Sequence, residues 1–294
     1  MTQGFSGVIA ATLTPVNAQL QPDLAKAHTY YEGLLAAGCD GLNVLGTTGE
    51  AMSFSVEQRA HLMRGLAKHG LPLERAMVGT GSSSLADTVA LTNTAIDAGF
   101  AGVLVMPPFF YRDASQDGIL EFFEALAKMT KIEPGKLYLY NFPQMSGTTF
   151  TLELVRRIRD ILPVAGLKDS SNDLRYAEAL HLAFPELRLF PSSESHLRFA
   201  KNMGFAGCIS GTVALWPKAA SDLWVHAEDA SSEPQQIQIT SRRDLVAAYP
   251  LIPAVRFLTA FEEKDESWER PLPPLQQLDA QAQAALCDRY LLSK

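Results

Sequence analysis

The chain has 294 residues, of which 47% are hydrophobic and 19% are charged, and its formal net charge is -7. This is enough apolar material for a large core, built as one barrel domain or as two smaller domains. The negative balance and the lack of any basic block exclude the electrostatic footprint of a nucleic-acid-binding protein. Cys39, Cys208 and Cys287 are far apart and odd in number, so we expect neither a disulfide framework nor a zinc site.

The beginning of the sequence predicts no targeting segment. Its first residues, M-T-Q-G-F-S-G-V, contain no basic region, and the longest apolar runs are too short to span a membrane. We therefore expect a soluble, cytoplasmic protein that has neither a nucleic acid nor a membrane as its partner.

Short apolar runs alternate with helix-like segments along most of the chain. The pattern predicts strands at residues 7–13, 41–46, 76–80, 102–106, 137–141, 164–168, 187–191 and 207–210. Helical spacing of apolar residues predicts helices between them, near residues 23–37, 55–69, 85–98, 115–129, 151–162, 173–184 and 196–203.

This alternation is typical of parallel βαβ units, which close into a (β/α)8 barrel or form a doubly wound open sheet. No G-x-G-x-x-G sequence follows the first strand, which weighs against a dinucleotide-binding fold and favours the α/β barrel. We predict that residues 1–217 form the barrel and carry the active site. From about Lys218 the pattern is helical alone, so residues 218–294 are predicted to be a helical extension packed on the barrel.

In a barrel of this kind, functional groups lie at the carboxyl ends of the strands and in the loops that follow. Lys168 ends the sixth predicted strand, where burial would disfavour the ammonium form and leave an amine able to form a Schiff base. A strand-end lysine taken alone more often reaches water along its aliphatic stem. Polar residues that follow the other strands converge on the same mouth and favour the catalytic interpretation: Thr47, Thr48, Tyr111, Tyr140, Ser192, Glu194, Ser210 and Thr212.

Structural roles are open to several of these residues. Thr47 and Thr48 could form a turn that caps the next helix, and Tyr140 could be a packed aromatic residue. Glu50 lies beyond the turn and is expected to be a structural carboxylate rather than a base. The six histidines show no metal-ligand spacing, so no metal site is predicted. The loop G-T-G-S-S-S at 79–84 lacks the lysine of a phosphate-binding loop and is better interpreted as a helix cap.

Three motifs, in this order and spacing, resemble the dihydrodipicolinate synthase and N-acetylneuraminate lyase family. They are G-T-T-G-E at 46–50, Y-N-F-P at 140–143 and G-L-K-D at 166–169, and the similarity covers nearly all of the barrel region. The resemblance implies a (β/α)8 barrel with a C-terminal helical extension. It also implies a homo-oligomer, either a dimer or a tetramer.

The resemblance further implies that Lys168 forms the Schiff base with pyruvate or another 2-oxo acid, while Tyr140 acts as general acid and base. Thr47 would relay protons between Tyr140 and Tyr111, which in this family reaches in from a neighbouring subunit. The backbone N–H groups of Thr47 and Thr48 would hold the pyruvate carboxylate. The expected substrate-binding set is completed by Gly49, Ser192, Glu194 and Ile209. No cofactor is required, because a protonated imine is itself an electron sink.

The sequence departs from the family pattern around the second substrate. Dihydrodipicolinate synthases carry an arginine shortly after Y-N-x-P that binds the carboxylate of aspartate semialdehyde, and Met145 stands in that position here. A thioether cannot make the bidentate pair of a guanidinium. The loop P-S-S-E-S at 191–195 offers hydroxyls and a carboxylate, which suits a polyhydroxylated substrate. Phe109 and Phe110 would make one wall of the mouth more apolar.

We therefore expect a class I lyase that cleaves, forms or dehydrates a 2-oxo-3-deoxy acid of the sugar-acid type through an imine on Lys168. One alternative is a 4-hydroxy-tetrahydrodipicolinate (dihydrodipicolinate) synthase that recruits another cation in place of the missing arginine. The other is a non-catalytic barrel that binds pyruvate-like acids.

Overall fold

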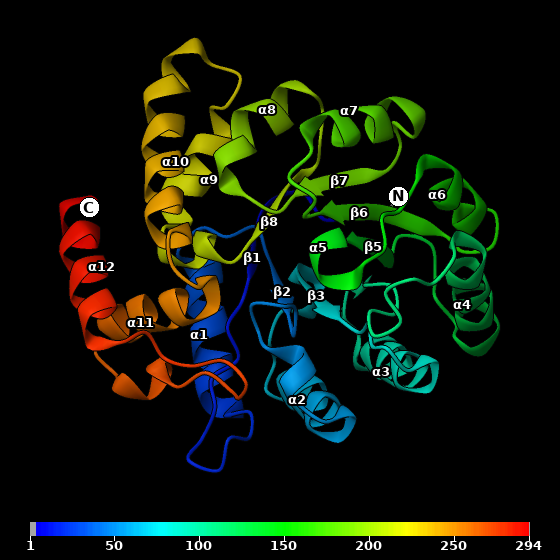
Figure 1. Cartoon of the computed structure of the whole chain (residues 1–294), viewed down its shortest axis with the longest axis horizontal. Coiled ribbons are helices and arrows are strands. Elements are labelled where there is room, and N and C mark those ends of the chain that lie inside the picture. Colours follow the sequence, from blue (N-terminus) through cyan, green and yellow to red (C-terminus); the bar gives the residue numbers. More distant parts are fainter. Residues whose placement is uncertain (1–3, 294) are drawn as a thin grey trace.

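The computed structural model describes residues 4–293 and shows eight parallel strands surrounded by helices (Figure 1). The strands are β1 (Gly7–Ala11), β2 (Gly41–Val44), β3 (Ala76–Gly79), β4 (Gly102–Val105), β5 (Leu137–Asn141), β6 (Val164–Asp169), β7 (Arg188–Pro191) and β8 (Gly207–Ser210). They pair in the order β7-β6-β5-β4-β3-β2-β1-β8, and β7 also contacts β8. The predicted (β/α)8 barrel is confirmed, since an open doubly wound sheet reverses its strand order. The predicted domain ends, residues 1–3 and 294, lie outside the described residues.

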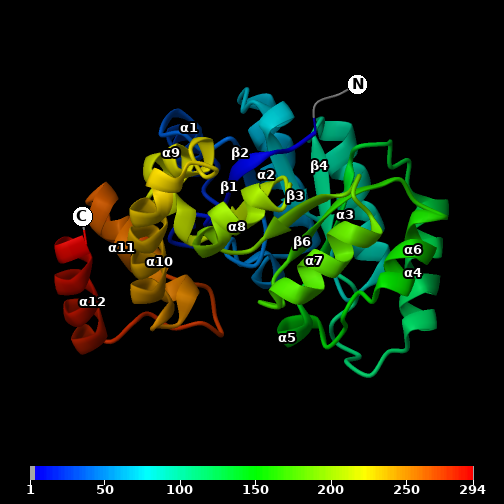
Figure 2. The same cartoon turned by 90° about the horizontal axis from the view of Figure 1, so that it is seen from above.

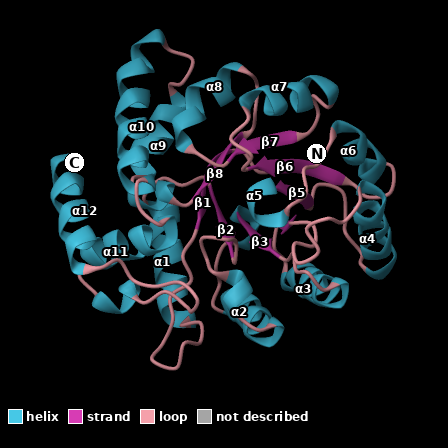
Figure 3. Ribbon diagram, viewed as in Figure 1, coloured by secondary structure: helices cyan, strands magenta, loops and turns pink. Residues whose placement is uncertain are grey.

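Helices form the outer layer, and the strands form the centre (Figure 3). The helices are α1 (Leu24–Ala36), α2 (Val56–Lys68), α3 (Leu85–Ala98), α4 (Gln116–Met129), α5 (Pro143–Ser146), α6 (Leu152–Arg159), α7 (Leu174–Ala183), α8 (Leu197–Asn202), α9 (Pro217–Val225), α10 (Glu233–Ala247), α11 (Leu251–Glu263) and α12 (Ala280–Ser293). Local signals set their ends. Ser55 and Gln58 form a capping box at the start of α2, and Gly99, with φ of 95°, ends α3 in the left-handed conformation.

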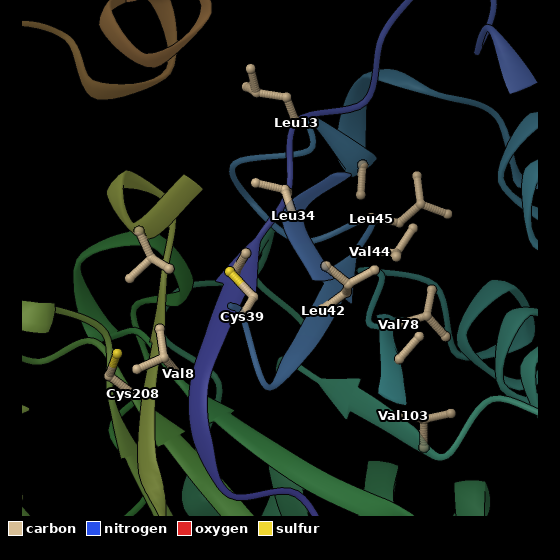
Figure 4. Close-up of a cluster of buried hydrophobic side chains, with 14 of the residues drawn as sticks. Val8, Leu13, Leu34, Cys39, Leu42, Val44, Leu45, Val78, Val103 and Cys208 are labelled. Carbon is tan, nitrogen blue, oxygen red and sulfur yellow. The ribbon is translucent and has the colours of Figure 1, made fainter. Parts of the chain in front are cut away.

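Side chains alternate along each strand between the helices and the barrel interior. The outward set packs between strands and helices, and Figure 4 shows Val8, Leu42, Val78 and Val103 among its members. The inward set fills the lumen with a second buried cluster, which includes Ile9, Met77, Leu104, Tyr138, Tyr140, Phe190 and Ile209. The barrel interior is therefore a packed core. A site for chemistry is expected at the carboxyl ends of the strands and in the loops that follow them.

The helices α10, α11 and α12 gather on one side of the barrel (Figures 1 and 2). The helix α9 contacts both β1 and α8, so it lies in the ring of barrel helices although it begins at residue 217. The division of the chain at 217 and 218 stays a prediction. Within residues 4–293, no single helix is long and apolar enough to cross a membrane, although the bent pair 230–247 and 251–263 would meet that length and apolarity together.

Candidate active site

Lys168 lies near the end of β6 with only 4% of its surface exposed. It is in register with Tyr140 on the neighbouring strand β5. Its Nζ atom lies 4.4 Å from the centroid of the Tyr140 ring. None of the ion pairs among the described residues involves Lys168. The amine is thus buried against an aromatic face, with no carboxylate to fix its charge.

A glycine two residues before the lysine makes the room for this arrangement. Gly166 and Lys168 face the lumen from β6, as Tyr138 and Tyr140 do from β5, and the two strands pair Tyr138 with Gly166. A Cβ atom at Gly166 would lie 2.8 Å from the Tyr138 ring and 2.2 Å from the carbonyl oxygen of Arg188. Any larger residue would therefore displace the ring that closes the lumen beneath the amine.

Thr47 and Tyr140 meet through their hydroxyls at the mouth of the barrel. The Oγ1 atom of Thr47, in the loop after β2, lies 3.3 Å from the phenolic oxygen of Tyr140. Both residues line a cavity of about 330 Å³ that opens above the strands. The structure thus places a lysine amine over the ring of a tyrosine whose hydroxyl contacts a second hydroxyl, which is an arrangement able to move a proton beside a Schiff base.

The loop that carries Thr47 is held in a strained conformation. Leu45 and Glu50 both adopt the left-handed region, with φ of 52° and 53°, and such residues persist where their surroundings hold them. Glu50 is buried, and its carboxylate forms an ion pair with Arg256 of α11 and accepts a hydrogen bond of 2.6 Å from the N–H of Leu272. The expectation that Glu50 is a structural carboxylate agrees with this ion pair. Sequence spacing gave no signal for the partner Arg256.

A second polar network fixes the ends of β5 and β6 relative to each other. Asn141 donates from Nδ2 to Asp169 Oδ1 at 2.7 Å, and its Oδ1 accepts from the N–H of Phe150 at 3.1 Å. Ser171 also donates to the Asp169 carboxylate, from its N–H and its hydroxyl. Burial raises the pKa of Asp169 above its ordinary value. These bonds lie directly beside Tyr140 and Lys168, so they position the two side chains that carry the proposed chemistry.

The cavity above Tyr140 is lined mainly by apolar side chains. Its lining residues are Leu45, Gly46, Thr47, Glu50, Ala51, Met52, Ser53, Gly79, Gly81, Leu104, Met106, Phe109, Tyr140, Met145, Ile252, Pro274 and Leu275. Met145, at the position where the family arginine is expected, is one of them. Ile252 comes from α11, and Pro274 and Leu275 come from the segment after it, so the predicted helical extension forms part of the cavity wall.

Tyr111 does not lie with the other predicted catalytic residues. It sits in the loop after β4, is 69% exposed, and packs edge-on against Phe110, which is 75% exposed. Neither ring lines the cavity. The placement of Tyr111 in a neighbouring subunit stays a prediction.

The predicted substrate-binding residues are spread over the rim and the interior. Thr48 and Gly49 are buried in the loop after β2, where Thr48 packs against Gly211 of the loop after β8. Ile209 faces the lumen and is part of its apolar cluster. Ser192 is half-buried, and its N–H donates to the carbonyl oxygen of Asp169 at 2.9 Å. None of these four lines the cavity.

Glu194 does not line the cavity. Its carboxylate is buried and accepts a hydrogen bond of 2.5 Å from the hydroxyl of Thr212, which itself accepts from Arg243 of α10 at 2.7 Å. The hydroxyl-rich loop at 191–195 therefore faces the barrel's contact with α10. Among residues 4–293, no three His, Cys, Asp or Glu side chains lie close enough together to hold a metal ion.

Comparison with known proteins gives consistent matches. The model of the Dihydrodipicolinate synthetase family matches residues 4–288. An uncharacterized DapA-like lyase of Chloroflexus aurantiacus is 33% identical over 97% of both chains, and a 4-hydroxy-tetrahydrodipicolinate synthase of Kosmotoga olearia is 31% identical over 70% of both.

Solved structures share the fold at lower sequence identity. YagE, a prophage protein of E. coli K12 in the dihydrodipicolinic acid synthase family, crystallised in complex with pyruvate, superposes with a TM-score of 0.88 at 23% identity over 98% of both chains. A variant of the 2-keto-3-deoxygluconate aldolase of Sulfolobus solfataricus superposes with a TM-score of 0.87 at 19% identity, over 98% of this chain and 96% of that one.

Proposed function

The chain belongs to the dihydrodipicolinate synthetase family and is a class I lyase, and on that premise we propose that Lys168 forms the Schiff base. The observation that carries this proposal is the geometry of one amine. Lys168 Nζ lies buried on the face of the Tyr140 ring, and the Tyr140 hydroxyl lies beside Thr47. None of the ion pairs among the described residues involves this amine, so no carboxylate blocks its approach to a carbonyl carbon.

We propose the following course for a 2-oxo-3-deoxy acid. The amine of Lys168 adds to the C2 carbonyl and water leaves, so a protonated imine forms. The imine accepts the electron pair released at C3 when the bond from C3 to C4 breaks, and an enamine results. Tyr140 takes the proton from the C4 hydroxyl, with Thr47 as its hydrogen-bond partner. The enamine is then protonated at C3, and water hydrolyses the imine to release pyruvate.

The loop after β2 supplies the donors we propose for the substrate carboxylate. No hydrogen bond from the N–H of Thr47 or Thr48 is present among the described residues. The ion pair between Glu50 and Arg256 ties this strained loop to α11. Donors fixed before the substrate arrives lose little free energy in orienting it.

Reduction with borohydride in the presence of pyruvate tests the role of Lys168. We expect a stable adduct on the wild-type chain, located at Lys168 by peptide mass spectrometry, and none on Lys168→Ala. The matched control is Lys201→Ala, because Lys201 Nζ also lies over an aromatic ring, 4.5 Å from the centroid of Trp224, but outside the barrel. An adduct that persists in Lys168→Ala, while circular dichroism shows an intact fold, would overturn the assignment.

A 4-hydroxy-tetrahydrodipicolinate synthase is the second candidate, and the relative from Kosmotoga olearia supports it. That reaction condenses pyruvate with aspartate semialdehyde, whose own carboxylate needs a cation. Among the described residues, none that lines the cavity is a lysine or an arginine. We therefore expect turnover with aspartate semialdehyde to be slow beside that with a 2-oxo-3-deoxy acid, in a coupled assay at equal enzyme concentration.

We also propose a cytoplasmic homo-oligomer in which Tyr111 enters the site of a neighbouring subunit. The exposure of Phe110 and Tyr111 supports a contact there, and the free cysteines suit a reducing compartment. Mixing inactive Lys168→Ala chains with Tyr111→Phe chains tests the sharing. We expect hybrids to regain activity, because one kind of site then contains both Lys168 and an intact Tyr111. Hybrids no more active than either parent would contradict it.

A further inference from the structure

We propose that the part of the substrate beyond C3 is apolar, an aryl or branched-alkyl group on a 4-hydroxy-2-oxo acid, rather than a polyhydroxylated chain. The inference rests on the proposed function, because it takes Lys168 and Tyr140 as the reacting end of the site. It differs from the sugar-acid substrate that the sequence favoured. The observations behind it are the lining of the 330 Å³ cavity and the hydrogen bonds of its few polar residues.

Apolar side chains reach this cavity from separate parts of the chain. Met52 comes from the turn after β2, Phe109 from the loop after β4, and Met145 from α5. Ile252 of α11 and Leu275 of the extension also line the cavity. An apolar wall built from five separate segments is a shaped pocket rather than a single exposed side chain.

The polar side chains of the lining already have partners. Both oxygens of Glu50 are used, by Arg256 and by the N–H of Leu272. The hydroxyl of Ser53 donates to the carbonyl oxygen of Pro273 at 3.4 Å. Thr47 and Tyr140 bond each other. A chain with several hydroxyls would bury them against carbon, and an unpaired buried hydroxyl costs free energy.

A substrate that carries a second negative charge fits the cavity no better than one with several hydroxyls. Glu50 is the one charged residue in the lining within residues 4–293, and it is already neutralised. Arg112 lies nearby, but its guanidinium donates to the carbonyl oxygens of Met145 and Gln144, at 3.4 Å and 3.3 Å, and it does not line the cavity.

The size of the cavity suits an aromatic group. An apolar protein cavity of about 150 Å³ holds benzene, so a cavity of about 330 Å³ has room for a phenyl ring. Tyr140 lines this cavity, and Lys168, which does not line it, lies against the Tyr140 ring. The methionines Met52, Met106 and Met145 can adjust to ring shape, because their side chains are unbranched and polarizable.

The simplest aryl substrate gives a balanced reaction. With 4-hydroxy-2-oxo-4-phenylbutanoate, Lys168 forms the imine at C2 and releases water. The bond from C3 to C4 breaks, its electron pair forms the enamine, and the proton of the C4 hydroxyl moves to Tyr140 as benzaldehyde leaves. Tyr140 passes that proton on to C3 of the enamine, and uptake of one water by the imine returns the free amine and pyruvate.

Pyruvate release from this acid and from 2-keto-3-deoxygluconate, assayed side by side, tests the inference. We expect kcat/KM to be at least tenfold higher for the aryl acid. Met145→Arg should lower that value at least tenfold, mainly through KM, because it places a cation in the apolar wall. Met129→Arg is the matched control. Met129 is 52% exposed and Met145 49%, but Met129 lies at the end of α4 away from the cavity, so kcat/KM should change less than twofold.

Two results would overturn the inference. One is a higher kcat/KM for 2-keto-3-deoxygluconate than for the aryl acid, and the other is an equal loss in the two arginine variants. If borohydride and pyruvate still label Lys168 in that preparation, the proposed function stands and only the apolar substrate class is wrong. If pyruvate labels nothing, the proposed function itself fails.

Discussion

Two buried cations at the same end of the barrel have opposite surroundings. Arg256 is fully buried, and it binds the carboxylate of Glu50 and the carbonyl oxygens of Thr14 and Trp268. Lys168 is almost as deeply buried, yet its amine lies over the Tyr140 ring and takes part in none of the ion pairs among the described residues. The contrast supports a structural role for Arg256, which is paired with a residue of the strained loop, and the proposed chemical role for Lys168.

Removing the Tyr140 hydroxyl should give the largest effect, a loss of kcat. It tests the surroundings of Lys168, the unpaired residue of the two. We expect Tyr140→Phe to lower kcat by about 10²- to 10⁴-fold, the usual contribution of a general acid or base. Borohydride trapping of pyruvate should continue in part, because the amine remains. Steady-state pyruvate release and intact mass measure the two functions separately.

Tyr138→Phe is the matched control, since Tyr138 lies on the same strand and face, deeper in the lumen. It should leave kcat within about threefold of the wild-type value, below the range of a lost proton carrier. A Tyr140→Phe variant that loses trapping and turnover to the same degree would contradict the role assigned to its hydroxyl.

Breaking the ion pair between Glu50 and Arg256 should instead reduce the stability of the fold. Arg256→Met leaves the Glu50 carboxylate buried without its cation, and we expect the free energy of unfolding to fall by about 3–5 kcal/mol. Urea denaturation measures it. The double variant Glu50→Gln with Arg256→Met should be less destabilised than the single one, because the uncompensated charge has gone.

The exposed ion pair between Arg157 and Asp117, 2.7 Å apart, provides the control. Arg157→Met should cost no more than about 1 kcal/mol, as is usual for a surface pair. A similar cost for Arg256→Met would mean that the buried pair does not hold the loop.

The smallest effect concerns Asp169, a buried carboxyl next to Lys168 on β6 whose pKa is raised by desolvation. A raised folded-state pKa makes the folded protein bind the proton more tightly than the unfolded chain, whose carboxyl has a pKa of about 3.9. The contribution of Asp169 to stability is thus fully present below the unfolded pKa. It is lost as the pH rises through the folded pKa, by at most about 1.4 kcal/mol per pH unit for one proton.

Unfolding free energies measured from pH 3.5 upward should therefore show a shallower fall in Asp169→Asn than in the wild type. The asparagine still accepts from Asn141 and from the N–H of Ser171. Identical slopes in the two proteins would show that the Asp169 carboxyl does not titrate differently in the folded state.

Much of the architecture could be predicted from the sequence, because local signals determine it. Strands at 137–141 and 207–210 have the predicted bounds, and alternation placed Tyr140 and Lys168 on the lumen side. The helix α5 was missed because four residues that begin with Pro143 show no periodicity. Tyr140 and Asn141 of the Y-N-F-P motif end β5, and Pro143 begins α5.

The surroundings of the site could not be predicted in the same way, because long-range contacts create them. Glu50 and Arg256 are 206 residues apart, and no spacing rule joins them. The hydroxyl-rich loop at 191–195 suggested a polar substrate pocket, but Glu194 is taken up by Thr212, which Arg243 also contacts. The apolar wall instead depends on Ile252 and Leu275, and nothing in the sequence around either residue indicates a place at the barrel mouth.

This contribution of the extension to the cavity has a consequence for synthesis. The eight strands and Lys168 emerge from the ribosome before residues 252 to 275 do. A nascent chain whose barrel has already folded therefore contains Lys168 while the cavity still lacks the part of its wall that residues 252 to 275 supply. Discrimination between substrates is acquired last, when the segment around Leu275 reaches the opening.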